Sequence, residues 1–91
     1  DTLQARVLFR FPLAIWAERN AYGSLAEQRD DGSAVRAFVV RQVDPFVRWV
    51  LACDGEAEIV APEALRQALR AMASRILAAH TGTGAGEVAD G

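Results

Sequence analysis

The chain has 91 residues, 52% of them hydrophobic and 24% charged, so it is long enough for one small folded domain, too short for two, and too apolar to remain disordered. Ten arginines against twelve acidic residues give a formal net charge of −2, which provides no overall electrostatic basis for nonspecific binding to nucleic acid or to a membrane. Because Cys53 is the only cysteine and His80 the only histidine, an intrachain disulfide is excluded, and we expect no metal site and no cofactor.

The N-terminal part of the chain predicts a strand and then a helix. Apolar and polar side chains alternate over residues 5–11, as they do in a strand with one buried face. The apolar face consists of Val7, Phe9 and Phe11. Pro12 suits the first turn of a helix, and apolar residues at helical spacing continue that helix to about residue 21.

The next segment predicts a β-hairpin. Residues 24–29 form a weak, polar strand, and residues 34–41 form a strongly apolar one. Asp31 and Gly32 between them are typical of a type I′ turn, in which both central residues have positive φ. The second strand of the hairpin is apolar on both faces, so we expect a covering layer on each side of the sheet and therefore a docking surface.

The C-terminal half predicts a helix, a strand and a longer helix. Asp44 followed by Pro45 is typical of a helix N-terminus, and the Asp54-Gly55 pair ends that helix. Residues 57–61 form a short strand. Pro62 starts the last helix, which reaches about His80 on an apolar stripe made of Leu65, Leu69, Met72, Ile76 and Leu77. Residues 81–91 are rich in Gly and Thr and predict a disordered tail after a domain of residues 1–80.

This order of elements predicts an α+β fold, a ferredoxin-like βαββαβ antiparallel sheet with an additional C-terminal helix. The first and third strands are then neighbours at the centre of the sheet, and helices cover one face and leave the other open. The register of the third strand decides which of its side chains face the helices. We favour Phe38 and Val40 toward the helices, with Arg36 on the same side, because the larger groups fill the space beneath helices.

Four stretches of the sequence are similar to one known family: the hairpin DDGSAVRAFVV, the helix DPFVRWVLACDG, the strand EAEIVAP and the helix start PEALRQAL. Over residues 5–80 the chain resembles the WCX domain, the C-terminal extension of bacterial WYL-domain transcriptional regulators. The resemblance implies a parent protein with an N-terminal winged helix-turn-helix and a WYL domain. It also implies that the WYL and WCX parts sense a ligand, in some members single-stranded DNA, and help the regulator to dimerise.

Our candidates for contact with a partner or ligand are five residues on or beside the two central strands: Arg6, Leu8, Arg10, Val39 and Arg41. Guanidinium groups on an open sheet face bind phosphates or partner carboxylates in a bidentate manner. Apolar atoms beside them mark an interface more often than bare surface. The simpler alternative is a solvated face on which arginine stems cover Leu8 and Ala37.

Other residue types give weaker signals. An aromatic platform for nucleic-acid bases needs two or three exposed rings on the strands, and only the less favoured register exposes even Phe38. Trp16 and Trp49 recur at helical spacing with other apolar residues, so we place them in the core or at its edge. Cys53 has no histidine close in sequence to activate it, and no phosphate loop or hydrolase motif occurs. We therefore expect that the chain is not an enzyme.

The predicted function is that of a regulatory or assembly module in a WYL-type bacterial transcriptional regulator, which makes interdomain or dimer contacts and relays effector binding to a DNA-binding domain outside this fragment. Expected partners are the WYL domain of the same or a second protomer, in a homodimeric, cytoplasmic protein without membrane contact. Two alternatives remain open. One is a small-molecule sensor with a closed polar pocket near Asp54-Gly55-Glu56, and the other is direct contact of the sheet-face arginines with single-stranded nucleic acid.

Overall fold

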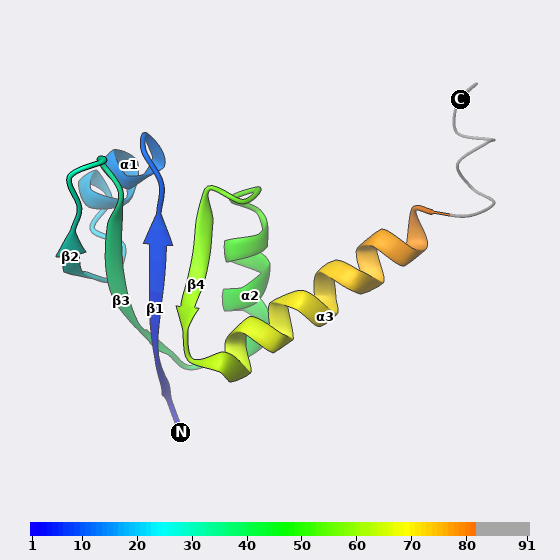
Figure 1. Cartoon of the computed structure of the whole chain (residues 1–91). Helices are drawn as coiled ribbons and strands as arrows, with labels where there is room; N and C mark the ends of the chain where they lie inside the picture. The colour runs from blue at the N-terminus through cyan, green and yellow to red at the C-terminus, as the bar shows by residue number, and fades with distance from the viewer. Residues whose placement is uncertain (82–91) are drawn as a thin grey trace.

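The computed structural model describes residues 1–81, which form four strands and three helices. In chain order these are β1 (Leu3–Phe9), α1 (Leu13–Arg19), β2 (Ser24–Gln28), β3 (Ala34–Val40), α2 (Val43–Leu51), β4 (Ala57–Ala61) and α3 (Glu63–Ala79) (Figure 1). The predicted ferredoxin-like α+β fold with an additional C-terminal helix is confirmed. The predicted tail, apart from Thr81, lies outside the described residues.

The strands form one antiparallel sheet in the order β2-β3-β1-β4. Figure 1 shows β1 and β3 side by side at the centre and β2 and β4 at the two edges, as predicted. The two helical crossovers explain this order. α1 carries the chain from β1 to β2 and α2 carries it from β3 to β4, so each crossover passes one strand position and leaves room for a central strand.

The core lies between one face of the sheet and the helices. Alternate residues of β1 and β3 pack there with the buried residues of α1 and α2. The largest fully buried side chains are Phe9, Leu65, Val7, Val47 and Val50. In Figure 1 no described helix crosses in front of the sheet, so the opposite face is open.

β1 ends two residues earlier than the alternation predicts. The Arg10 N–H still donates to the Glu56 carbonyl of the neighbouring chain segment at 2.9 Å, but the Arg10 carbonyl already accepts from Ala14 N–H at 2.9 Å as the chain turns into α1. Phe11 therefore leaves the sheet and is 60% exposed, so its predicted place on the buried face was wrong. Pro12 is the N-cap residue of α1.

The loop between β2 and β3 is not the predicted type I′ turn. Positive φ occurs at Gly32 (φ 89°) but not at Asp31. The Gly32 N–H donates to the Arg29 carbonyl at 3.2 Å, and the Asp31 carboxylate accepts from the backbone N–H and the hydroxyl of Ser33 at 2.9 and 2.6 Å. These forward hydrogen bonds of Asp31 favour a three-residue loop that ends in a left-handed glycine, a common alternative for hairpins.

α1 buries small residues in place of its tryptophan. Ala14 and Ala17 face the sheet, whereas Trp16 is 42% exposed and lies against Tyr22, with ring centroids 4.9 Å apart. Neighbouring helix positions differ by about 100° around the axis, so Trp16 lies beside the buried stripe when Ala17 occupies its centre. The core-edge position predicted for Trp49 is confirmed, because Trp49 is half-buried and packs against the core.

α2 begins at Val43 with Gln42 as N-cap, so the prediction of Asp44 as N-cap was wrong. The first N–H groups of a helix have no acceptor within it, so Pro45 fits at the third helical position as well as at the first. Asp44 instead lies in the first turn, where its negative charge interacts favourably with the helix dipole.

The apolar stripe of α3 is buried only over the first part of the helix. Leu65 and Met72 are buried and Leu69 is half-buried, but Ile76 is 47% and Leu77 65% exposed. Figure 1 shows the reason, because α3 runs away from the β4 edge of the sheet, so that its second half extends away from the strands, with the end of α2 on one side of it.

Candidate functional site

The register of β3 agrees with the favoured prediction. Phe38, Val40 and Arg36 pair with the β1 residues that face the helices, so all three lie on the helix side of the sheet. Residues of opposite parity therefore form the open face. This result removes Arg36 from the arginines that a sheet-face partner could reach.

Three of the five candidate residues share the open face: Arg6, Leu8 and Val39. Arg6 pairs with Ala37 and Leu8 pairs with Val35 across the two central strands, while Val39 lies nearer the end of β3. Arg6 is exposed and Leu8 is half-buried. The open face is thus apolar along its centre, with arginine beside it.

Much of that apolar centre is already shielded from water. Val35 is only 3% exposed although no described helix lies over it. Leu8 and Ala37, the residues that the arginine-stem alternative names, are both half-buried. Val39, in contrast, is 62% exposed. Val60, left unpaired where the β1–β4 register shifts, is 42% exposed. Apolar surface open to a partner is therefore concentrated around the end of the sheet where β1 begins.

The other two candidates lie at opposite ends of the sheet. Arg10 follows the last residue of β1, and Arg41 follows the last residue of β3, which runs antiparallel to β1. Arg41 is exposed. The five candidates therefore do not form one cluster, because Arg10 lies at the opposite end of the sheet from Val39 and Arg41.

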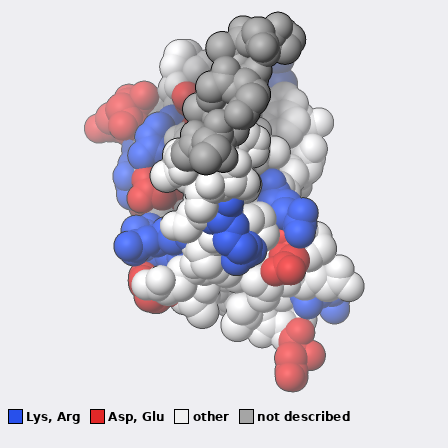
Figure 2. Space-filling model, turned by 90° about the vertical axis from the view of Figure 1, so that its right-hand side faces the viewer, with Lys and Arg blue, Asp and Glu red and all other residues white. Residues whose placement is uncertain are grey.

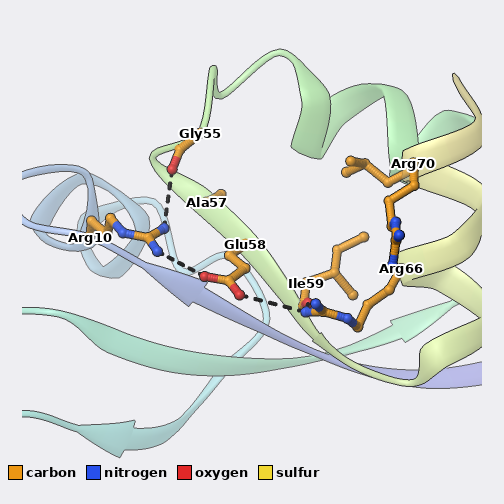
Figure 3. A pocket seen from close by; sticks show the side chains of 8 residues that line it. Arg10, Gly55, Ala57, Glu58, Ile59, Arg66 and Arg70 are labelled. Carbon is orange, nitrogen blue, oxygen red and sulfur yellow. Dashed lines mark hydrogen bonds and ion pairs between the residues drawn. The ribbon is translucent and has the colours of Figure 1, made fainter. Parts of the chain in front are cut away.

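Arg10 belongs to a three-residue bridge at the β4 edge. Its Nη2 donates to Glu58 Oε1 at 2.8 Å and its Nη1 donates to the Gly55 carbonyl at 3.1 Å. On the other side of Glu58, the Arg66 guanidinium from α3 lies 3.5 Å from Oε2 and donates to the Ile59 carbonyl at 2.6 Å. Figure 3 shows the Glu58 carboxylate between the two guanidinium groups. The hydrogen bond from Arg10 lowers the pKa of Glu58.

A half-open hollow of about 260 Å³ lies beside this bridge. Its lining combines the two bridging arginines with Arg70 of α3 and with the apolar side chains of Ala57, Ile59 and Leu69. The hollow includes Gly55, close to where the small-molecule alternative placed a pocket. It differs from that expectation because it is open on one side and lined largely by apolar atoms.

Sequence reasoning missed Glu58 as the shared partner of Arg10 and Arg66. No local pattern marks Glu58, because Arg10 and Glu58 are 48 positions apart. Their contact depends on β4 pairing with β1, which places Glu58 opposite Leu8. The alternation of β4 together with the ferredoxin-like strand order was the one signal that could have found it.

Arg36 is buried on the helix side, with an exposed fraction of 6%. Its Nε donates to the Tyr22 carbonyl at 2.5 Å, and within residues 1–81 no carboxylate pairs with it. A guanidinium held in this way connects β3 to the segment that follows α1. Its role is structural.

Aromatic side chains gather on the helix side of the sheet. Phe9, Phe38, Phe46, Trp49 and Tyr22 form a chain of ring contacts with centroid separations between 5.3 and 6.2 Å. On the described strands, no aromatic residue occupies an open-face position. The open face therefore lacks the stacking platform that many single-stranded nucleic-acid binders use.

The charges on the β4 and α3 side of the molecule are mixed. Figure 2 looks at this side and shows arginine and acidic side chains interspersed over its surface. The ion pairs of Arg10 and Arg66 with Glu58, and of Arg66 with Glu63, belong to this region. A surface of this kind favours pairwise contacts over long-range attraction of a polyanion.

The remaining reactive residues are in ordinary environments. Burial raises the pKa of the Cys53 thiol, whose Sγ lies 3.5 Å from the Trp49 carbonyl. His80 is the C-cap residue of α3, and its Nδ1 lies 2.9 Å from the Ile76 carbonyl. In the part of the chain that the structure describes, no group of three or more His, Cys, Asp and Glu residues could hold a metal ion, and no helix is long and apolar enough to cross a membrane.

Comparison with known proteins identifies the family. The family model of the WCX domain matches residues 1–77, which is most of the chain and covers all four strands. No curated protein matches the chain. Because the family match spans well over half of the chain, the chain belongs to the WCX domain family, the regulatory domains of WYL-type transcriptional regulators.

Proposed function

We propose that this chain is the assembly and signal-relay module of a bacterial WYL-type regulator and that it acts by docking, without catalysis. The observation that carries the proposal is the exposed apolar end of the open sheet face. Val39 is 62% and Val60 42% exposed there, and no described element covers either one. The proposed partner is the WYL domain of the same or of a second protomer in a homodimeric regulator.

Docking at this end of the sheet has a clear physical basis. A partner that covers Val39 and Val60 removes apolar surface from water, at roughly 25 cal/mol per Å². Arg41 and Arg6 lie beside this surface and are exposed, so their guanidinium groups are available to partner carboxylates. An effector that binds the docked and undocked arrangements with different affinity then shifts the position of the DNA-reading domains.

A single charge at the apolar end tests the docking surface. In the full-length regulator, we expect Val39→Asp to weaken assembly at least about tenfold, because an aspartate would be desolvated in the interface. Leu25→Asp is the matched control, because Leu25 is 54% exposed but pairs with Arg36 on the helix side of the sheet. Analytical ultracentrifugation measures the assembly of both variants. Equal assembly of the two variants would contradict the proposal.

The self-association version has its own test. If a second protomer docks through the same face, the isolated chain should form dimers at high micromolar concentration, and the double variant Leu8→Asp, Val39→Asp should be monomeric. Circular dichroism establishes that the variant is folded. Light scattering that finds both proteins monomeric would leave the WYL domain as the proposed partner.

A small-molecule sensor remains the second candidate, because of the hollow at Arg10, Glu58 and Arg66. Its two bridging arginines and apolar floor suit an organic anion such as a medium-chain carboxylate. Hexanoate should then raise the melting temperature of the chain, and Arg66→Ala should abolish the rise, whereas Arg19→Ala on α1 should not. No rise with hexanoate would remove this candidate.

A further inference from the structure

A second surface, separate from the sheet face, lies between the end of α2 and the second half of α3. It is a groove of about 360 Å³. α3 contributes Met72, Arg75, Ile76 and Ala79, which have the spacing of one helix face, and α2 contributes Arg48 and Leu51. The floor of the groove is apolar, and Ile76 remains 47% exposed.

The charges along this groove are all of one sign. Its charged or titratable lining residues are Arg48, Arg75 and His80, and no carboxylate lines it. Neither arginine has an ion pair within residues 1–81, in contrast to Arg10, Arg29 and Arg66 elsewhere. A basic rim in a chain of net charge −2 points to a partner with negative charge.

From this charge complementarity we infer that the groove binds an acidic amphipathic helix of a partner protein. Apolar side chains of that helix pack on Met72, Ile76 and Leu51, and its carboxylates pair with Arg48 and Arg75. The apolar floor and the basic rim thus favour a helix with apolar side chains on one face and acidic residues beside that face, as in other helix-in-groove complexes.

Two other occupants fit the groove less well. A second copy of α3 would bring arginines together, because the helix contains three arginines and one acidic residue: Arg66, Arg70 and Arg75 against Glu63. Like charges at an interface are unfavourable. Single-stranded nucleic acid would find no Phe, Tyr or Trp side chain in the lining on which to stack a base.

A pair of designed peptides tests the inference on the full 91-residue chain. The first is a fluorescein-labelled helical peptide of about 14 residues, with leucines along one face and glutamates elsewhere. The second replaces every glutamate with lysine, and a scrambled acidic peptide has the same composition without the leucine face. Fluorescence anisotropy should give a dissociation constant below about 100 µM for the acidic helix alone.

Charge reversal in the groove provides the matched variants. The double variant Arg48→Glu, Arg75→Glu should weaken binding of the acidic helix at least about tenfold and should gain binding of the lysine helix. Arg19→Glu, an exposed arginine of α1 outside the groove, should change neither affinity. Val39→Asp should also have no effect, so the result is independent of docking at the sheet face.

Four binding results would overturn the inference. They are no saturable binding of the acidic helix, equal binding of the scrambled peptide, an equal loss in Arg19→Glu, and tighter binding of a single-stranded oligonucleotide through the same two arginines. A doubled solution mass of the chain that Ile76→Glu abolishes would assign the groove to a second copy instead and would also overturn it.

Discussion

At the scale of single residues, Glu58 links three elements. It joins Arg10, which follows β1, to Arg66 of α3, and it belongs to β4 itself. Its side chain is 44% exposed, so solvent screens both interactions and each contributes little by itself. The bridge nevertheless links β4 both to the end of β1 and to α3, at the edge where α3 meets the sheet.

Removing the charge of Glu58 should have a small, salt-dependent effect. We expect Glu58→Gln to lower the free energy of unfolding by about 0.5–1 kcal/mol at low ionic strength and by less in 1 M salt. Urea denaturation measures the change. Glu27→Gln is the control, because within residues 1–81 Glu27 pairs only with Arg29, two residues away, and its loss should lower the free energy of unfolding by less. A loss that salt does not reduce would show that the charges are not its cause.

Two glycines with positive φ should respond differently to a Cβ atom. At Gly23 (φ 61°) a Cβ would collide with the Ala37 carbonyl oxygen and would lie 3.1 Å from the Phe38 ring, whereas at Gly55 (φ 85°) nothing lies within 4 Å. We expect Gly23→Ala to lower the free energy of unfolding by more than about 2 kcal/mol and Gly55→Ala to lower it by about 1 kcal/mol. Urea denaturation of both variants measures the difference, and equal losses would contradict the steric argument.

At the scale of elements, α3 divides into an anchored half and a projecting half. Leu65 is 1% exposed in the first and Leu77 is 65% exposed in the second. Leu65→Ala should therefore lower the free energy of unfolding by about 2–4 kcal/mol, and Leu77→Ala by less than about 0.5 kcal/mol. Denaturant titration of the two variants checks this, and similar losses would mean that the second half packs on the domain in solution.

At the scale of the whole molecule, acid should destabilise the fold through its carboxylates. Hydrogen bonds from Arg10 and Ser33 lower the pKa of Glu58 and of Asp31. A folded pKa below the unfolded value means that the contribution is present above the unfolded pKa and is lost as the pH falls through the folded one. Melting temperatures between pH 7 and pH 3 should therefore fall, and they should fall less steeply in Glu58→Gln.

The sequence by itself determined the order of the elements, the bounds of β4 and the apolar character of both faces of β3. Local alternation, helical spacing and turn residues carry this information within a few positions. The family resemblance also came from such local stretches, and the family match over residues 1–77 confirmed it.

Only the tertiary structure decided which of those residues meet. The Arg10–Glu58–Arg66 bridge depends on β4 lying beside β1 and on the direction of α3, and the separation of Arg10 from Arg41 depends on the antiparallel pairing of β1 and β3. The exposure of Trp16 and Ile76 likewise depends on where their helices meet the sheet. Periodicity specifies the face of an element, but burial and charge pairing are set by what the rest of the chain places opposite that face.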